Sequence, residues 1–454
     1  MSPSATDALS PVDGRYRATT EPLRGLLSES GLIRERIRVE ALWLLHLLAA
    51  TPKLPGGQLA PAVRGEAERL AREPPADAVE RVKAIESRIN HDVKAVEYYV
   101  RERLAQAGAT PASLELVHFG CTSEDINNVC YARLLRAARE VLLEVLGQRQ
   151  SALSELAQRY ADLPMLARTH GQPASPTTLG KEFANFAARL LRGRDRLAGV
   201  RVLGKWNGAV GNFNAHVLAL PEIDWLETSR RFIDALGLEE NVWTTQIEPH
   251  DWIGEYCDAL AAINMMLVDA CRDLWGYVAL GYLRQRAKDD EVGSSTMPHK
   301  VNPIDFENSE GNIGVANALL RHLSDKLPVS RWQRDLSDST AQRNLGAALG
   351  HTLLAYAACL RGLGKLEADP ARLAGDLEAN WEVLAEAVQQ VMRRHGVPEA
   401  YEKLKALSRG RRLERAELAA FVKALEIPDE AKKRLLALTP AKYTGLAAEL
   451  AKRV

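Results

Sequence analysis

The chain has 454 residues, which is enough for two or three domains around a substantial core. Lysine plus arginine and aspartate plus glutamate each total 59, and this balance excludes the long-range field expected of a protein that binds nucleic acid or an anionic membrane. The five cysteines are odd in number and lack metal-ligand spacing, the first residues lack a signal pattern, and no apolar run approaches the roughly 20 residues of a membrane span. We therefore expect a cytoplasmic protein.

Helical periodicity dominates the chain and predicts an all-α fold. Residues 1–115 divide into shorter helices, with a Pro/Gly-rich interruption at 51–57. In this region Asn90 and His91 precede Asp92, a carboxylate able to orient the imidazole. The segment fits either a turn that contacts a ligand or an exposed polar turn of a helix, and the sequence alone leaves both interpretations open.

The next segment places Thr122 and Ser123 where the N-terminal cap of a helix over 122–163 is expected. Such a helix would be about 60 Å long. Its positive end can bind a carboxylate or a phosphate without an added cation. A capping box without a ligand explains the same residues, and the upstream His118, Phe119 and Gly120 favour the ligand.

A second dense segment follows that helix and contains His170 between Thr169 and Gly171. An isolated histidine is more often structural. Here two prolines, at 173 and 176, predict a rigid turn, and Thr169 and Gln172 could fix the tautomer of the ring. We therefore expect His170 to be presented to a cleft.

Long proline-poor stretches predict the helices of a central bundle, over residues 122–163, 176–203, 249–286, 304–326 and 339–366. The expected organisation is an N-terminal helical domain (1–115), this bundle domain (116–366) and a C-terminal helical domain (367–454). The apolar stripes of such long helices exceed what one layer can cover, so we expect a symmetric dimer or tetramer with a shared multi-helix core. A monomer that covers the stripes with its own terminal domains is the alternative.

The loop over 293–303 concentrates two serines, a histidine, a lysine and an asparagine between a glycine and a proline. Glycine and proline disfavour regular structure, and the polar groups can bind anions and move protons. A solvated linker is the alternative. We favour a functional loop, because linkers seldom combine His and Asn with a Gly-Ser-Ser hinge.

The segment 331–343 contains three arginines and two serines, a composition suited to a phosphate. A surface ladder of Arg–Asp ion pairs is the alternative. Motifs for a phosphate loop, a zinc protease or a dinucleotide fold are absent from the sequence, so we expect neither a metal nor a cofactor.

The loop matches Gly-Ser-Ser-x-Met-Pro-x-Lys-x-Asn-Pro, the shared motif of the fumarase/aspartase superfamily. Nearly end to end, the chain resembles the bacterial adenylosuccinate lyases of that superfamily. The segments that carry the resemblance are 10–16, 90–92, 122–123, 168–172, 244–250, 293–303 and 334–343. Other members share the loop but not the Asp-Gly-Arg-Tyr start or the Arg-Ser-Arg cluster. Thr296 stands where some adenylosuccinate lyases have alanine.

This resemblance implies elimination of fumarate from adenylosuccinate, giving AMP, and from succinylaminoimidazole carboxamide ribotide (SAICAR), giving AICAR, by a homotetramer whose pockets each draw on three subunits. It implies Ser294 as general base and His170 as general acid. The implied substrate-binding residues are Arg15, Tyr16, Asn90, His91, Asp92, Thr122, Ser123, Gln246, Lys300, Asn302, Arg334, Ser339 and Arg343. The partners expected are succinylated purine nucleotides and further copies of the chain.

Three rival functions remain. Another fumarate-releasing enzyme, chiefly argininosuccinate lyase, shares the loop. A structural protein on the same scaffold, as some lens crystallins of this superfamily are, would tolerate loss of Ser294 or His170, and both are present. A nucleotide-binding regulatory module would need the pocket without the acid and base.

Overall fold

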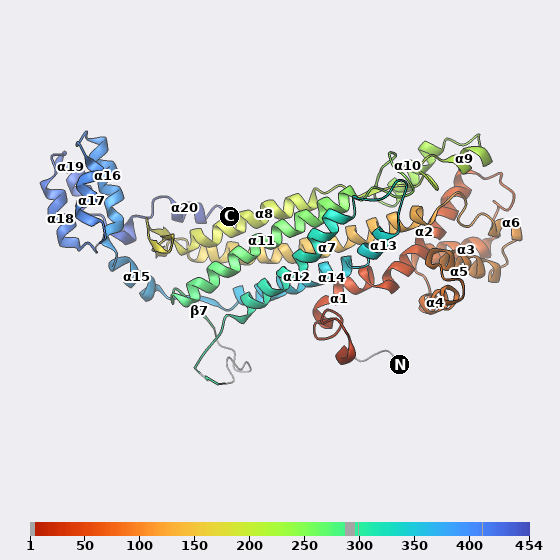
Figure 1. Cartoon of the computed structure of the whole chain (residues 1–454), viewed down its shortest axis with the longest axis horizontal. Helices are drawn as coiled ribbons and strands as arrows, with labels where there is room; N and C mark the ends of the chain where they lie inside the picture. The colour runs from red at the N-terminus through yellow and green to blue at the C-terminus, as the bar shows by residue number, and fades with distance from the viewer. Residues whose placement is uncertain (1–4, 287–295, 298, 411) are drawn as a thin grey trace. The chain divides into compact units, whose positions relative to one another are not determined.

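The computed structural model describes residues 5–286, 296–297, 299–410 and 412–454. Over these residues helices dominate and strands are short, which confirms the predicted all-α fold (Figure 1). The chain divides into two compact units. Unit 1 contains residues 1–145, 193–264 and 311–355, and unit 2 contains residues 146–192, 265–310 and 356–454. The division into domains 1–115, 116–366 and 367–454 stays a prediction.

The first part of the chain forms η1 (Ala5–Asp7), α1 (Arg17–Leu27), α2 (Glu29–Ala50), α3 (Pro61–Arg72), α4 (Ala78–Ile89), α5 (Asp92–Gln106) and α6 (Pro111–Leu114). The long helices are α7 (Ser123–Arg159), α8 (Leu179–Ala198), α11 (Asp251–Ala279), α12 (Ile304–Lys326) and α14 (Leu345–Leu363). Shorter helices between them are α9 (Asn214–Ala219), α10 (Trp225–Ala235) and α13 (Ser337–Gln342). The last part forms α15 (Pro370–Glu378), η2 (Trp381–Leu384), α16 (Ala385–Arg394), α17 (Ala400–Ser408), α18 (Arg415–Ala424), α19 (Asp429–Leu436), η3 (Pro440–Lys442) and α20 (Ala447–Ala451).

Short strand pairs reverse the chain where helices end. Antiparallel pairs join β1 (Pro164–Met165) to β4 (Thr177–Thr178), β2 (Arg168–Thr169) to β3 (Gln172–Pro173), and β7 (Leu283–Gln285) to β8 (Leu366–Ala368). A parallel pair joins β5 (Leu203–Gly204) to β6 (Glu239–Glu240). Pairs this short leave no alternating pattern in the sequence, so helical periodicity could not predict them.

The predicted long helices are present, but several of their ends were wrong. The helix expected over 176–203 stops at Ala198, before Gly199, and the one expected over 249–286 stops at Ala279. Gly281 has φ 75°, a left-handed conformation that suits glycine at a helix C-terminus. The helix expected over 339–366 begins at Leu345, because a separate short helix, α13, precedes it.

In unit 1, α2 packs against α3, α4 and α5 around a buried apolar cluster (Figure 1). The ring centroid of Trp43 on α2 lies 4.9 Å from that of Trp206 and 5.1 Å from that of Phe232. Aromatic pairs at such distances add about 0.5–1.5 kcal/mol beyond the area they bury. This aromatic cluster fixes α2, the helix that also carries Arg36.

Buried polar contacts join the long helices within unit 1. Asn264 on α11 donates from Nδ2 to Asn317 Oδ1 on α12 at 2.8 Å, and it lies 3.4 Å from Thr352 Oγ1 on α14. Tyr256 on α11 donates to the Leu135 carbonyl on α7 at 3.4 Å. Because buried polar groups need partners, these bonds favour one register between the helices.

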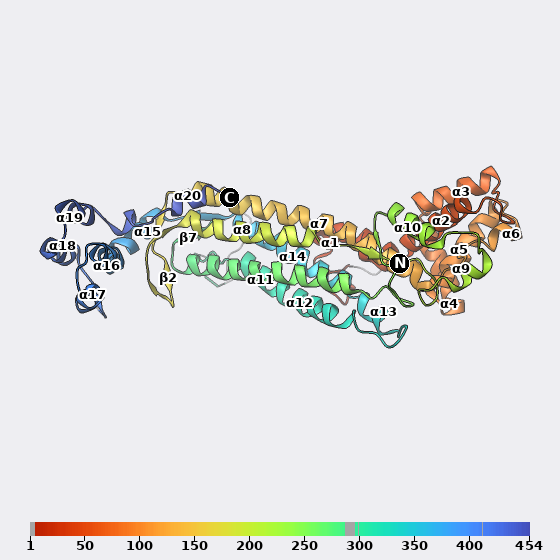
Figure 2. The same ribbon diagram turned by 90° about the horizontal axis from the view of Figure 1, so that it is seen from above.

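In unit 2, α16, α17, α18 and α19 surround a second apolar core (Figure 2). Arg149 Nε on α7 donates to the Tyr356 carbonyl on α14 at 2.8 Å. Phe306 on α12 packs directly over Gly362 of α14, where a side chain would not fit.

Within the described part of the chain, the helices are all too short or too polar to cross a membrane.

Candidate active site

The N-terminus of α7 forms the first part of the candidate site, in unit 1. The Thr122 N–H donates to Asp125 Oδ2 at 2.8 Å, so Asp125 caps the helix, and Ser123 is its first helical residue. The side chains of Thr122 and Ser123 are half-buried rather than closed off. The cap and the ligand-binding interpretation are therefore compatible, since the positive helix end stays accessible to a carboxylate.

A buried ion pair ties this helix end to a neighbouring loop. Lys205 Nζ lies 3.2 Å from Asp125 Oδ1, and both side chains are almost wholly buried. The same ammonium donates to the carbonyl of Gln246 at 2.8 Å. Gln246 Nε2 in turn donates to the Ala209 carbonyl at 3.2 Å. A charge pair that the sequence did not reveal thus links the predicted substrate residue Gln246 to Asp125, which bonds Thr122.

The Asn90–Asp92 turn joins α4 to α5. Asn90 ends α4 in the left-handed conformation, with φ 54°, which asparagine tolerates better than most residues. His91 caps α5, and its Nδ1 accepts a hydrogen bond from the Lys94 N–H at 3.2 Å. Asp92 was expected to orient His91, but its Oδ2 pairs with Arg36 NH2 of α2 at 2.9 Å, whereas its Oδ1 lies 3.8 Å from the imidazole.

This ion pair sets the charge of Asp92. Burial would raise the pKa of the Asp92 carboxyl, but the Arg36 guanidinium and the Val93 N–H outweigh it and the net pKa lies below its ordinary value. Asp92 is accordingly a fixed acceptor at neutral pH.

Arg334 and Ser339 meet in the segment that leads into α13. Arg334 NH2 donates to Ser339 Oγ at 2.9 Å and lies 3.0 Å from Glu124 Oε1. Arg331 instead pairs with Asp335 at 3.3 Å on the surface. The ladder interpretation therefore holds for Arg331, while Arg334 turns inward and contacts Ser339 and Glu124.

Three ligating groups lie close behind Arg334: donor atoms of Glu124, His250 and Asp338 fall within 4.8 Å of one another. Arg334 Nε is 3.5 Å from Asp338 Oδ2, so the guanidinium lies against both carboxylates of this group. Burial would raise the pKa of the Asp338 carboxyl, but His250 and Arg334 lower it below its ordinary value. The positive charge that these carboxylates hold is therefore the guanidinium of Arg334.

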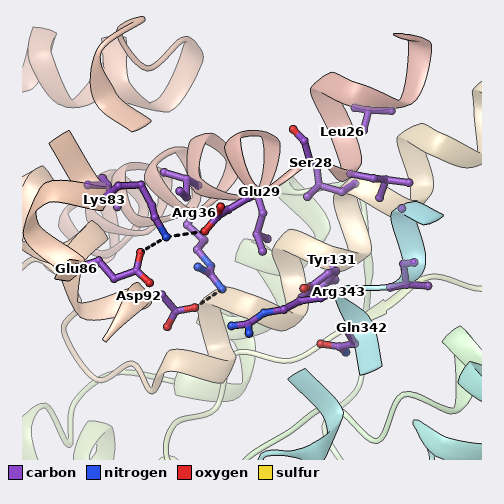
Figure 3. Close-up of a pocket in the computed structure, with 17 residues that line it drawn as sticks. Leu26, Ser28, Glu29, Arg36, Lys83, Glu86, Asp92, Tyr131, Gln342 and Arg343 are labelled. Atoms are coloured by element: carbon purple, nitrogen blue, oxygen red, sulfur yellow. Dashed lines mark hydrogen bonds and ion pairs between the residues drawn. The ribbon is translucent and has the colours of Figure 1, made fainter. Parts of the chain in front are cut away.

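A cavity of about 450 Å³ opens between α2, α4, α7 and α14 in unit 1 (Figure 3). Asp92 and Arg343 line it, together with Tyr131 and Arg36. Arg343 is exposed, and among the described residues no hydrogen bond or ion pair occupies its guanidinium. Burial raises the pKa of the Tyr131 phenol to about 12, so it remains a neutral donor. The cavity offers an anion a free guanidinium and a phenol.

Arg15 and Tyr16 lie in a turn that precedes α1. The Tyr16 N–H donates to the Pro11 carbonyl at 2.9 Å, and the Arg15 guanidinium stands 5.9 Å from the Tyr16 ring centroid. Arg15 is exposed and Tyr16 half-buried. Both side chains are therefore available to a ligand.

In unit 2, His170 occupies the tip of the hairpin formed by β2 and β3. His170 and Gly171 both have positive φ, 53° and 74°, as a two-residue type I′ turn requires. The residue is exposed. Arg168, at the base of the hairpin, pairs with Asp376 and with Tyr282. The predicted turn is present and leaves the imidazole exposed, whereas its presentation to a cleft stays a prediction.

The Gly-Ser-Ser loop is only partly described. Ser294, the predicted base, lies outside the described residues. Lys300 is exposed, and its N–H donates to the Met297 carbonyl at 3.1 Å. Asn302 is half-buried two residues before α12 begins at Ile304.

Unit 1 therefore brings together most of the predicted substrate residues, while His170, Lys300 and Asn302 belong to unit 2. Sequence reasoning missed the side chains that hold them: Arg36, Glu124, Lys205 and Asp338. The signal for Glu124 was its place beside the Thr122–Ser123 cap. Arg36 and Lys205 gave no local signal, because each pairs with a residue far away in the sequence.

Two family models and several curated proteins match this chain over most of its length. The profile "Lyase" matches residues 14–320, and "Adenylosuccinate lyase C-terminal" matches residues 330–444. The adenylosuccinate lyase of Escherichia coli (strain K12) is 50% identical over 98% of both chains, and that of Vibrio cholerae (strain O395) is 51% identical over 99% of both.

Two solved structures share the fold at lower identity. A 3-carboxy-cis,cis-muconate lactonizing enzyme from Pseudomonas putida has a TM-score of 0.73 at 24% identity, covering 95% of both chains. A fumarate lyase from Mesorhizobium sp. BNC1 has a TM-score of 0.75 at 19% identity, covering 95% of this chain and 96% of that one. On the evidence of the long, closely related sequences above, the chain belongs to the adenylosuccinate lyase family.

Proposed function

We propose that unit 1 binds the nucleotide part and a carboxylate of a succinylated purine nucleotide, and that unit 2 supplies the groups that move protons. As a member of its family, the chain is an enzyme that eliminates fumarate from adenylosuccinate to give AMP, and from SAICAR to give AICAR. One observation carries the residue assignment. A single network of ion pairs and hydrogen bonds links Asp92, the start of α7 and Arg334 in unit 1.

The reaction needs a strong anion site. Removing a proton beside a carboxylate creates a dianionic intermediate before the C–N bond breaks, and fixed donors must stabilise its charge. Thr122 and Ser123 can supply hydroxyls and the helix end of α7 at that point. Lys300, Asn302 and Gln246 would complete the contacts to the succinyl group.

The proton transfers would fall to Ser294 and His170. A serine hydroxyl is a weak base in water, so Ser294 requires neighbouring donors, chiefly Lys300, and a loop that excludes water. His170 would protonate the departing nitrogen, a task suited to a side chain that titrates near neutrality. The exposed hairpin tip leaves the imidazole free to meet a substrate.

The phosphate would be bound by Arg334, Ser339 and Arg343, with Arg15 and Tyr16 beside them. Arg334 and Ser339 already contact each other, and Arg343 lines the cavity, where no described residue pairs with its guanidinium. His91 and Asn90 would contact the substrate near Asp92, which is held as a carboxylate by Arg36.

We further propose that the site is completed by different copies of the chain in a cytoplasmic homotetramer. Ser123 opens α7, and His170 follows the end of that helix. The family resemblance implies pockets that each draw on three subunits, so the acid, the base and the helix end would come from different copies.

The assignment is tested by incubating the purified protein with adenylosuccinate and separating the products by chromatography. AMP and fumarate in equal amounts, formed without added metal, are expected. Argininosuccinate is the matched alternative substrate. Cleavage of argininosuccinate with adenylosuccinate left intact would overturn the assignment in favour of the related lyase.

A further inference from the structure

Arg36, in the middle of α2 (Glu29–Ala50), is a buried arginine in the wall of the nucleotide cavity (Figure 3). Only 6% of the residue is exposed. Its NH2 group lies 2.9 Å from Asp92 Oδ2, and its Nε donates to Asn127 Oδ1 at 2.9 Å. A buried guanidinium is costly unless it is paired and hydrogen-bonded, so these two partners determine its orientation.

The Asn127 contact continues towards the phosphate residues. Asn127 Nδ2 donates to Glu124 Oε1 at 2.8 Å, and the same oxygen lies 3.0 Å from Arg334 NH2. Arg334 NH2 then donates to Ser339 Oγ at 2.9 Å. One unbroken path therefore joins the carboxylate that begins α5 to the guanidinium that precedes α13.

The residues inside this path are inaccessible to a substrate carboxylate or phosphate. Asn127 is 8% exposed and Glu124 2%, and the atoms of Glu124 that bond Asn127 and Arg334 are one and the same oxygen. Their effect on a ligand must therefore pass through Asp92 and Arg334, the half-buried ends of the path.

We propose that Arg36 is a positioning residue that fixes the distance between the Asp92 carboxylate and the Arg334 guanidinium, acting through Asn127 and Glu124. This inference rests on the proposed function, in which Asp92 and Arg334 contact two different parts of one nucleotide. A nucleotide is a ligand of nearly fixed length, so a site that holds both contacts at a set spacing binds it with less loss of conformational entropy.

The choice of arginine follows from its geometry. The planar guanidinium donates in two fixed directions at once, here to a carboxylate and to an amide oxygen. A lysine keeps the charge, and it could replace the ion pair with Asp92. It cannot hold Asp92 and Asn127 in the same fixed relation.

The experiment compares Michaelis constants for adenylosuccinate in Arg36→Met, Arg36→Lys and Asn127→Leu. Loss of a hydrogen bond to a charged group costs about 10-fold or more in affinity, so KM should rise at least tenfold in Arg36→Met, with kcat changed by less than about threefold. The KM of Arg36→Lys should fall between that of Arg36→Met and that of the wild type. Asn127→Leu, which keeps the branched shape of the side chain but cuts the path at its centre, should also raise KM about tenfold.

A double variant tests the path itself. If Arg36 reaches Arg334 through Glu124, the KM of Arg36→Met/Glu124→Gln should be at least about fivefold below the product of the two single effects. Arg38→Met is the matched control on the same helix. Arg38 pairs with Glu35 at 3.0 Å, away from Asp92, and its loss should leave KM within about twofold of wild type.

Circular dichroism and native mass spectrometry establish that each variant is folded and assembled. A folded Arg36→Met protein with an unchanged KM would overturn the proposal. A double variant whose rise in KM equals the product of the two single rises would overturn it as well. If Arg36→Met does not fold, the Asn127→Leu variant is the test. An unchanged KM in Asn127→Leu would then overturn the proposal. A wild-type protein that leaves adenylosuccinate intact would instead remove the proposed function, and this inference with it.

Discussion

Lys205 is a buried charge that links two parts of the candidate site. Its ammonium is wholly buried and bonds Asp125 Oδ1 at 3.2 Å, the Gly208 carbonyl at 2.9 Å and the Gln246 carbonyl at 2.8 Å. Asp125 also accepts from the Thr122 N–H. The buried Lys205–Asp125 ion pair therefore connects the backbone of Gln246 to the start of α7 at Thr122.

Replacing Lys205 with methionine should destabilise the protein strongly. The substitution leaves the Asp125 carboxylate buried without its partner, which costs about 3–5 kcal/mol in unfolding free energy. Urea unfolding followed by circular dichroism measures the loss. Lys432→Met is the control, because Lys432 is only half-buried and donates to a backbone carbonyl, that of Lys423 at 3.3 Å, rather than to a buried carboxylate. Equal stability of the two variants would show that the buried pair contributes nothing.

His170 and Ser294 should matter for turnover and little for binding or assembly. Each of His170→Gln and Ser294→Ala removes a proton-transfer group, and such groups contribute about 10²–10⁴-fold to rate. Stopped assays for fumarate give kcat, and calorimetry with AMP gives product affinity. Ordinary turnover in Ser294→Ala would remove that serine from the mechanism, and an unaffected His170→Gln would do the same for the acid.

The pair of His118 and Glu40 should make stability depend on pH. Their side chains meet at 2.6 Å; burial would lower the pKa of His118, but Glu40 raises it above its ordinary value. A raised folded pKa gives stability that is complete below about pH 6.5, the unfolded value, and is lost as pH rises through the folded pKa. His118→Gln should therefore cost more unfolding free energy at pH 6 than at pH 9. In a Glu40→Gln background that difference should vanish; a difference that persists would assign the pH dependence elsewhere.

At the scale of elements, the junction of α7 with α8 in unit 2 depends on one glycine. The Gly180 N–H donates to the Tyr160 carbonyl at 2.9 Å, and a Cβ at this position would lie 2.3 Å from the Ala157 carbonyl oxygen. Backbone atoms cannot move aside as a flexible side chain can. Close approach of the two helices therefore requires glycine here.

Gly180→Ala should lower stability by about 3 kcal/mol, because the added methyl meets backbone. Gly65→Ala, within α3, is the matched control. A Cβ there meets nothing within 4 Å, so alanine should stabilise the helix by about 0.5–1 kcal/mol. Thermal unfolding of both variants measures the two effects. A Gly180→Ala protein as stable as Gly65→Ala would contradict the packing described.

The elements also show what the sequence could and could not predict. Long helices such as α12 follow from a periodic pattern that lies within the helix itself, and α12 was predicted with both ends correct. The turn at His170 followed from Thr, Gly and Pro beside it. The partner of Asp92 could not be found in this way, since Arg36 is 56 residues earlier in numbering and only the packing of α2 against α5 brings it near.

On the scale of the whole molecule, the exposed apolar side chains point to further copies of the chain. On α11, Met265 is 48% exposed and Trp275 46%, and on α12 Val315 is 46% exposed. Long helices with such side chains suit the shared core of the proposed tetramer. The tetramer would then not only stabilise the folded chain. Each active site would need residues from several copies.

Mixing two inactive variants tests this central claim most directly. Purified His170→Gln and Ser294→Ala proteins are combined in equal amounts, subunits are exchanged by mild denaturation and renaturation, and native mass spectrometry confirms hybrid tetramers. If acid and base come from different copies, random assembly gives intact pairs in about a quarter of the sites, and fumarate release should approach a quarter of the wild-type rate. Confirmed hybrids that release no more fumarate than the two variants added together would contradict the shared site.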